Sequence, residues 1–167
     1  MSGTLLRSVT LIAATITMGL AAGTFAVFAH TIMPGLHKTD DRTFVEAFHQ
    51  IDRAIINPWF MAGGFLGALV LTLAAAATNL HQPTLPWIIV ALILYLIAFI
   101  VTVAVNVPLN DALKAAGDPD HVTNLAHVRQ QFHETRWATW NLIRTITTTV
   151  AFGSLVWALV LHGRASA

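Results

Sequence analysis

Five side chains in the last third of the chain combine aromatic rings with hydrogen-bonding groups: Trp137, Trp140, Asn141, Arg144 and Thr148. They recur at i, i+3, i+4, i+7 and i+11, so a helix would place all five on one face. An arginine that shares its face with an asparagine and a threonine favours a polar interior, where its donors can stabilise a developing negative charge. The alternative is a belt of interfacial tryptophans whose arginine extends to the membrane surface.

A second candidate is the segment 40–56, which carries an apolar and a polar stripe. Apolar residues recur at i, i+4, i+7 and i+11 from Phe44, whereas Glu46, His49 and Arg53 recur at i, i+3 and i+7. This pattern predicts an amphipathic helix that lies over the mouth of a helical bundle. Glu-x-x-His is also the spacing of carboxylate-bridged di-metal bundles, in which both side chains face one site. The alternative is a solvated helix face with an ordinary i, i+3 pair.

Imidazole and carboxylate side chains in the polar segments, or at their border, could together form a metal site: His30, Glu46, His49, His127, His133 and Glu134. Such a donor set suits Fe, Cu or Zn. The alternative is an ordinary histidine-rich surface, so the cofactor is open between none and Fe or Cu. A haem would need two histidines at similar depth, and only His30 is near the membrane region.

The charge pattern predicts the elements that position these residues. Hydrophobic residues make up 56% of the 167-residue chain and charged residues only 10%, against about 25% charged in soluble proteins. Three long runs contain no Asp, Glu, Lys or Arg: 8–36, 54–110 and 145–163. The middle run is long enough for two membrane-spanning helices. We therefore expect a single all-α domain over residues 1–167, an integral membrane four-helix bundle with spans of about 8–32, 57–79, 86–108 and 139–161.

The polar segments 37–56 and 111–136, in the first and third loops, are expected to form amphipathic cap helices on one side of the membrane. They contain all eight acidic residues of the chain. In the second of them, residues 117–119 predict a turn, and a helix is expected from His121 to Arg136. The cap also holds more Lys and Arg than the opposite side, so the positive-inside rule predicts that it lies in the cytoplasm. The expected location is a bacterial cell membrane.

Two prolines lie at the cap ends of the predicted spans. Pro34 is expected to end the first helix, whereas Pro108 interrupts the third helix at membrane depth. This interruption would bring polar side chains toward Arg144. We expect Asp111 or Glu46 to be the acidic partner of that arginine.

Composition also limits the partners of the chain. It has no cysteine, which excludes disulfides and thiolate metal sites. Its net charge is +1 and it has no basic run, so nothing supports nucleic-acid binding. The lipid bilayer is an expected partner, and the glycines within 19–23 and 63–67 favour close helix packing. These glycine-rich faces could also form a homo-oligomer.

Four stretches of the chain follow a family pattern in the family's order: Phe28–Gly35 (FAxxxMPG), Asp40–Phe60 (DDRTFVEAxxQIxRAIINPWF), Val105–Leu113 (VNVPLNDAL) and Arg136–Thr145 (RWxxWNxxRT). Together they resemble the anthrone oxygenase-like family of small four-helix membrane proteins. Characterised fungal members oxidise anthrones to anthraquinones with dioxygen, without an established cofactor. The resemblance therefore implies an oxygenase that acts on a lipophilic phenolic or anthrone-like aromatic molecule.

The family pattern points to nine positions: Glu46, Asn57, Pro58, Asn106, Pro108, Asn110, Trp140, Asn141 and Arg144. His30 and His49 depart from that pattern. An oxygenase of this kind needs a base to ionise an activated C–H or phenol group, because the carbanion reacts readily with dioxygen. We predict Glu46 or His49 as that base.

Arg144, Asn106 and Asn141 are predicted to stabilise the enolate oxygen as oriented donors. The predicted substrate-binding residues, with the tryptophans as an aromatic wall, are Trp59, Trp137, Trp140, Asn57 and Asn110. If a metal is present, the cap histidines hold it and dioxygen binds there. The alternative is a non-enzymatic small membrane bundle that binds a metal, a haem, a lipid or a partner membrane protein, with a purely structural polar face.

Overall fold

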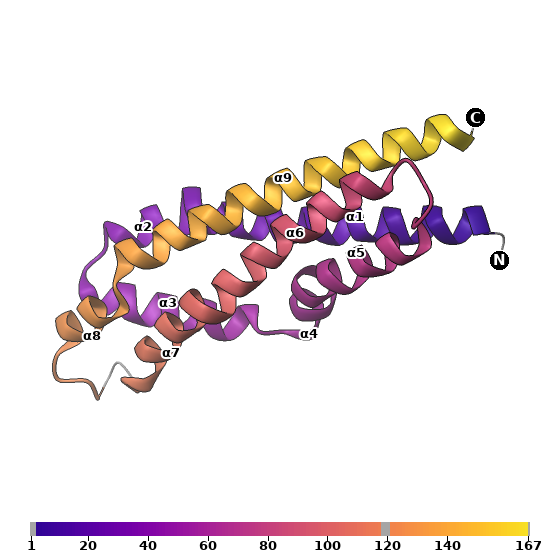
Figure 1. Cartoon of the computed structure of the whole chain (residues 1–167). Coiled ribbons are helices and arrows are strands. Elements are labelled where there is room, and N and C mark those ends of the chain that lie inside the picture. Colours follow the sequence, from indigo (N-terminus) through magenta and orange to yellow (C-terminus); the bar gives the residue numbers. More distant parts are fainter. Residues whose placement is uncertain (1–2, 118–120, 167) are drawn as a thin grey trace.

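The chain folds into four long helices that lie side by side, with two short helices covering one end of the bundle (Figure 1). The computed structural model describes residues 3–117 and 121–166, and no strand occurs among them. Within this part, four helical stretches are long and apolar enough to cross a membrane. The predicted all-α four-helix bundle is therefore confirmed, and the chain is an integral membrane protein.

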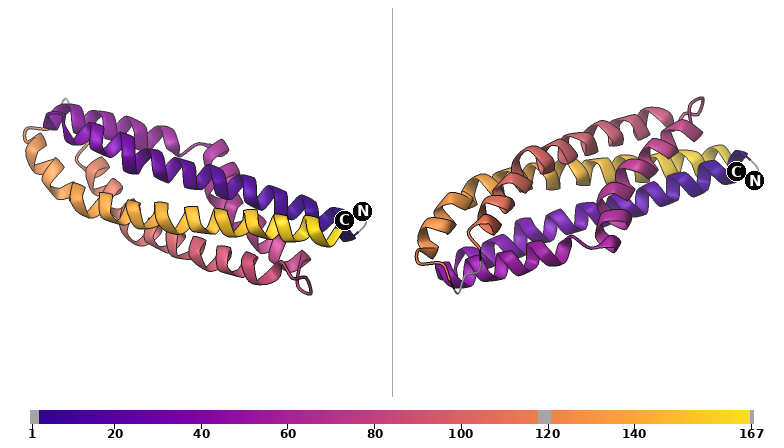
Figure 2. Two further views of the ribbon diagram at one scale, coloured as in Figure 1. Left: turned by 90° about the horizontal axis from the view of Figure 1, so that it is seen from above. Right: turned by 90° about the horizontal axis from the view of Figure 1, so that it is seen from below.

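Each long helix except the last is built from several segments. The first comprises α1 (Gly3–Val27), a π-helical turn (Phe28–Ile32) and α2 (Met33–His37). The second comprises α4 (Pro58–Phe60), a π turn (Met61–Phe65) and α5 (Leu66–Thr78). The third comprises α6 (Leu85–Val101), a π turn (Thr102–Asn106) and α7 (Val107–Ala115). The fourth is α9 (Glu134–Ser166), while α3 (Asp41–Ile55) and α8 (Leu125–Phe132) lie at the end opposite both termini (Figure 2).

The membrane-spanning part of the bundle is packed through small side chains. Alanines from all four long helices are buried there: Ala14, Ala21, Ala68, Ala75, Ala91, Ala98, Ala151 and Ala158. Small residues let helices approach closely where lipid removes the hydrophobic driving force. Gly19 contributes to this packing, because a Cβ atom there would touch the ring of Phe152 on α9. Gly23 and Gly63 have open space around them, and a homo-oligomer stays a prediction.

The cap has an apolar core of its own, separate from that of the bundle. α3 buries Phe44 and Phe48, α8 buries Phe132, and the start of α9 buries Trp137. The rings of Phe48 and Phe132 lie 4.6 Å apart between centroids. The predicted amphipathic helix of the first loop is therefore confirmed, with its apolar stripe facing the bundle mouth.

The predicted cap helix of the third loop is broken. Instead of one helix from His121 to Arg136, α8 and α9 meet at His133, which has a left-handed backbone with φ 52°. A left-handed residue stops a helix and redirects the chain. Residues 118–120 lie outside the described residues, and with them most of the predicted turn at 117–119.

Each π turn is followed, two residues after its end, by a proline or a glycine: Pro34, Gly67 and Pro108. A proline ring in an α-helix clashes with the carbonyl of residue i−4, and the extra residue of a π turn moves that carbonyl away. Pro34 therefore does not end the first helix, contrary to the prediction, and the helix continues to His37. Pro108 likewise lies inside a helix that runs without a break to Ala115.

The second π turn predicts a specific sensitivity at Gly67, where a Cβ atom would collide with the carbonyl oxygen of Ala62. Gly67→Ala is expected to lower the free energy of unfolding by about 2 kcal/mol, because the turn or its contact with α1 must shift. Thermal unfolding in detergent measures this. Gly63→Ala is the matched control, since nothing lies within 4 Å of its Cβ position, and equal stability of the two variants would contradict the prediction.

Candidate active site

A cavity of about 170 Å³ lies between the bundle and the cap. Its walls come from all four long helices, from α3 and from the link after α3: Phe25, Phe28, Phe48, Asp52, Ile55, Ile56, Phe60, Met61, Phe65, Thr102, Val107, Asn110, Trp137 and Arg144. Most of these side chains are apolar, and a few polar groups converge among them. This is the usual composition of a small-molecule site.

The three π turns border this cavity. Phe28 comes from the first turn, Met61 and Phe65 from the second, and Thr102 from the third. π turns are frequent at functional sites, where they re-aim side chains. The second turn is held by Tyr95 on α6, whose buried hydroxyl donates a hydrogen bond to the carbonyl oxygen of Phe65 at 2.7 Å. The irregular backbone therefore positions the cavity walls.

Arg144 supplies the positive charge of the cavity. It is 5% exposed and lies within the stretch Leu125–Ala165, which is long and apolar enough to cross a membrane. Its guanidinium donates hydrogen bonds to Asn141 Oδ1 at 2.7 Å and to Thr102 Oγ1 at 3.1 Å. It also lies 4.5 Å from the ring centroid of Phe25 and 5.5 Å from that of Trp137. Arg144 therefore faces a polar interior and does not extend to the membrane surface.

All of these partners are electrically neutral. No carboxylate of the described residues forms an ion pair with Arg144. Asp111 pairs instead with Lys114 at 2.8 Å, and Glu46 is exposed, so the predicted acidic partner is wrong in both forms. The Nε–H of Arg144 is also buried and has no hydrogen-bond acceptor among the residues that the structure describes. A buried cation with an unused donor is costly, and it fits a site that receives an anionic oxygen from a ligand.

A second charged group, Asp52 on α3, faces the same cavity. Asp52 is 7% exposed; its Oδ1 accepts a hydrogen bond from Asn110 Nδ2 at 2.6 Å, and its Oδ2 pairs with Lys114 Nζ at 3.0 Å. Asn110 in turn accepts a hydrogen bond from the indole N–H of Trp137 at 2.7 Å. Lys114 also contacts the exposed carboxylate of Asp111. These contacts connect the cavity with the surface of the cap.

The two predicted bases do not line the cavity. Glu46 is exposed on α3, and His49 is buried but away from the cavity wall. Asp52 is the acidic side chain that lines it. The sequence carried a signal for this residue, because Phe48, Asp52 and Ile55 recur at i, i+4 and i+7. An acid on the apolar stripe of an amphipathic helix is buried with that stripe.

The predicted asparagines next to Arg144 support the site from behind. Asn141 accepts from Arg144 and donates from Nδ2 to the carbonyl oxygen of Phe25 at 3.2 Å. Asn106 donates from Nδ2 to the carbonyl oxygen of Trp137 at 3.3 Å. Neither asparagine lines the cavity. Both hold helices together and so position the groups that do.

The predicted substrate-binding residues divide into two groups. Trp137 and Asn110 line the cavity. Trp59 is 67% exposed on the outer surface, and Trp140 lines a different groove. Asn57 is a structural residue, because its side chain caps the N-terminus of α4.

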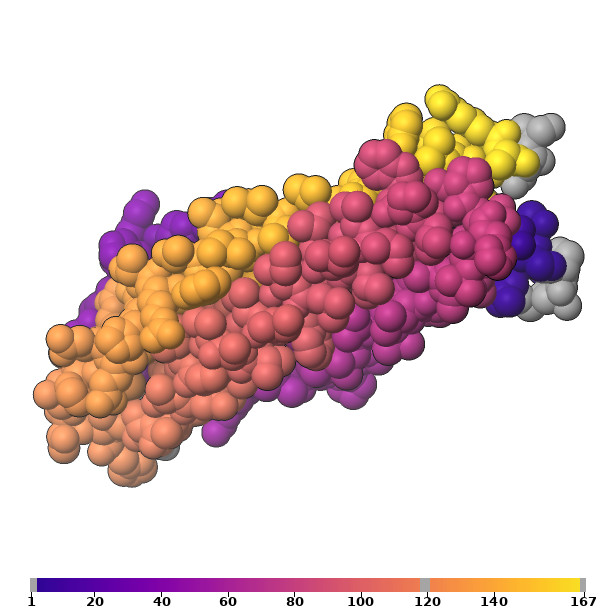
Figure 3. Space-filling model, viewed as in Figure 1, coloured from indigo at the N-terminus to yellow at the C-terminus, as the bar shows by residue number. Residues whose placement is uncertain are grey.

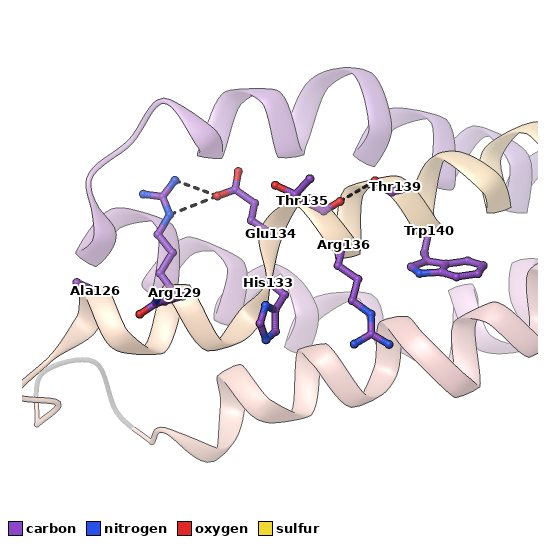
Figure 4. A pocket seen from close by; sticks show the side chains of 9 residues that line it. Ala126, Arg129, His133, Glu134, Thr135, Arg136, Thr139 and Trp140 are labelled. Atoms are coloured by element: carbon purple, nitrogen blue, oxygen red, sulfur yellow. Dashed lines mark hydrogen bonds and ion pairs between the residues drawn. The ribbon is translucent and has the colours of Figure 1, made fainter.

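That other groove is larger, about 710 Å³, and more open, and it lies beside the start of α9 (Figure 4). The carboxylate of this groove, Glu134, already forms an ion pair with Arg129, with 3.1 Å between Arg129 Nη2 and Glu134 Oε2. Figure 4 shows His133, Arg136 and Trp140 pointing away from Glu134. Because the groove is open and its carboxylate is occupied, we place the candidate site in the smaller cavity.

The six predicted metal ligands are not brought together. His30 and His127 form hydrogen bonds with neighbours on their own helices, and Glu134 Oε1 lies 2.7 Å from His37 Nδ1. Across residues 3–117 and 121–166, no group of three His, Asp or Glu side chains is arranged to hold a metal ion. The predicted set is dispersed because its members come from different elements, with His30 in the first π turn and the others on α3, on α8 and where α8 meets α9.

The fold and the site define a class of protein: a four-helix membrane protein with an apolar cavity and a buried arginine beneath a polar cap. Residues 48–154 match the family described as anthrone oxygenase, and this range is more than half of the chain. The chain therefore belongs to that family, as the resemblance implied. The matched range includes Asp52, Asn110 and Arg144 but not Glu46. No curated protein and no solved structure matches the chain.

The neutral surroundings of Arg144 predict that stability does not depend on its charge. Arg144→Met is expected to change the free energy of unfolding by less than about 1 kcal/mol, because removing the desolvation cost offsets the lost hydrogen bonds. Arg129→Met is the contrasting variant. Arg129 contacts two backbone carbonyls and two carboxylates, and its loss is expected to cost about 2 kcal/mol. Thermal unfolding in detergent compares them, and a larger loss at Arg144 would contradict the prediction.

Proposed function

We propose that the protein is a membrane oxygenase that uses dioxygen to oxidise a lipophilic phenolic or anthrone-like substrate in the cavity beneath the cap. Family membership supports an oxygenase-like activity. The observation that carries the proposal is the buried guanidinium of Arg144, which has no carboxylate partner among the described residues and an Nε–H without an acceptor. An ionised phenol or enolate oxygen would supply both missing contacts.

The proposed reaction converts the methylene group of an anthrone into a ketone. The carbon loses both hydrogens and gains one atom of dioxygen, and the second oxygen atom leaves with the two hydrogens as water. Dioxygen accepts the four electrons that the carbon gives up. The anion of the substrate reacts with dioxygen far more readily than the neutral molecule, so the task of the protein is to remove a proton and to hold the anion.

Asp52 is the proposed base and Arg144 the proposed anion-binding group. The Asp52 carboxylate lines the cavity, is oriented by Asn110 and Lys114, and retains lone pairs that can accept a proton. Arg144 faces the same space and can hold the oxygen on which the negative charge develops. This assignment replaces Glu46 and His49 with an acid that lines the cavity wall.

The size and lining of the cavity suit one ring of such a substrate. A protein cavity of about 150 Å³ is enough to enclose benzene, and this one measures about 170 Å³. Phenylalanines surround it on several sides: Phe25, Phe28, Phe48, Phe60 and Phe65. The reacting ring would lie among them with its oxygen at Arg144, while the remaining rings of an anthrone extend toward the open side.

The proposal predicts that Asp52→Asn abolishes turnover. Removing a general base lowers the rate by about 100-fold or more, which oxygen uptake with anthrone as substrate would measure in detergent or nanodiscs. Glu46→Gln and His49→Gln are the matched controls on the same helix, and both are expected to stay within about twofold of the wild type. Full activity in Asp52→Asn, with helical content unchanged by circular dichroism, would exclude Asp52 as the base.

Lys114 gives a second test, because it is the cation that neutralises Asp52. Lys114→Met leaves the carboxylate with Asn110 alone, and its ionised form loses an ion pair of 3.0 Å. Lys114 also fixes the position of the carboxylate, and a displacement of a catalytic group by about 1 Å can cost about 100-fold in rate, so we expect oxygen uptake to drop by about tenfold. Lys114→Arg keeps the charge and should recover most of the rate. Equal rates in Lys114→Met and the wild type would contradict this role.

A further inference from the structure

The cavity reaches the outer surface of the protein at two aliphatic side chains. Ile56, in the link between α3 and α4, is 61% exposed, and Val107, at the start of α7, is 41% exposed. Both also line the cavity. The space beneath the cap therefore has a mouth whose rim is apolar.

This mouth continues the lipid-facing surface of the third long helix. Ile100 and Val103 precede Val107 on the same long helix, and they are 61% and 54% exposed. The whole stretch from Leu85 to Ala115 is long and apolar enough to span a membrane. Trp59, 67% exposed three residues after Ile56, has the side chain that favours the border between hydrocarbon and headgroups. The mouth therefore opens toward the bilayer, near its surface.

The helices that carry the two sides of this mouth diverge toward the cap. α5 and α6 meet at their connecting loop and diverge toward the cap, so that α4 and α7 lie apart (Figures 1 and 2). The aromatic core of the cap is almost completely buried, with Phe44, Phe48 and Phe132 at 2% exposure or less. On the face seen in Figure 3, atoms of α7, α8 and the start of α9 adjoin one another at the cap.

We propose that the ligand enters the cavity from the bilayer, through the mouth between Ile56 and Val107. The occupant is a planar aromatic molecule dissolved in lipid that carries one ionisable oxygen at its leading edge. Its rings pass between aliphatic side chains, and its oxygen meets Arg144 inside. The class of ligand rests on the proposed function, whereas the route rests on the geometry of the mouth.

The route is tested by binding kinetics in lipid nanodiscs, with 2-hydroxyanthracene as a fluorescent probe that accepts energy from the tryptophans. Ile56→Phe/Val107→Phe narrows the mouth without adding a tryptophan, and association and dissociation rates are expected to fall together by tenfold or more, with Kd little changed. Val103→Phe is the matched control, because Val103 is lipid-facing on the same helix but does not line the cavity. It is expected to bind at the wild-type rate.

A second pair of changes keeps the test decisive if the bulky variant fails to fold. Ile56→Ala/Val107→Ala widens the mouth and is expected to speed association severalfold. Unchanged rates in the folded variants, equal slowing in Val103→Phe, or no binding of the probe to the wild type would overturn the route. If binding of the probe depends on the mouth but the protein takes up no oxygen with anthrone, the oxygenase proposal is overturned and the route stands.

Discussion

The desolvation of a buried arginine is the constraint that the arrangement of the site satisfies. An arginine buried in a membrane-spanning helix costs up to about 3 kcal/mol, and Arg144, which lies toward the cap end of α9, offsets this cost with neutral hydrogen-bond acceptors and aromatic rings. These partners come from three of the long helices, and the π turns help to bring them together. Thr102 lies in the third π turn. Phe25 lies just before the first π turn, and its carbonyl oxygen accepts a hydrogen bond from Asn141. The cap then separates the charge from water. The cavity, the widened turns and the cap thus form one arrangement around a single guanidinium.

The two charges of the site belong to different parts of the fold. Asp52 comes from the cap and has its own cation in Lys114, whereas Arg144 comes from the bundle and has only neutral partners. Because Lys114 neutralises Asp52, the carboxylate does not neutralise Arg144. In the proposed reaction this separation keeps the base and the anion-binding group distinct, with the substrate between them. A direct ion pair of Asp52 with Arg144 would satisfy both groups and leave neither for a ligand.

Much of the fold could be predicted from the sequence, because the uncharged runs and the stripe around Phe44 depend on local patterns. The prediction was wrong at Pro34, where the helix continues through a π turn, and at His133, where a left-handed residue breaks the helix. Both features depend on how the surrounding helices pack. In the site, the helix face that the sequence assigns to Arg144 also carries Trp137, and both residues line the cavity. Asp52 was overlooked in favour of Glu46 and His49, which form a familiar spacing but lie off the cavity. Periodicity indicates the face of a helix, while burial on that face is decided by the neighbouring helices.

The most direct test of the central claim is the ionisation of a bound phenol. A hydroxyanthraquinone changes its visible absorbance when it loses its proton, so a spectrophotometric pH titration in nanodiscs reports the charge state of the bound ligand. If Arg144 receives an anionic oxygen, the ligand should ionise at a pH at least one unit lower on the wild type than in lipid alone, which corresponds to about a tenfold preference for the anion. Arg144→Met should abolish this shift. A bound ligand that ionises as it does in lipid, or an equal shift in Arg144→Met, would contradict the account.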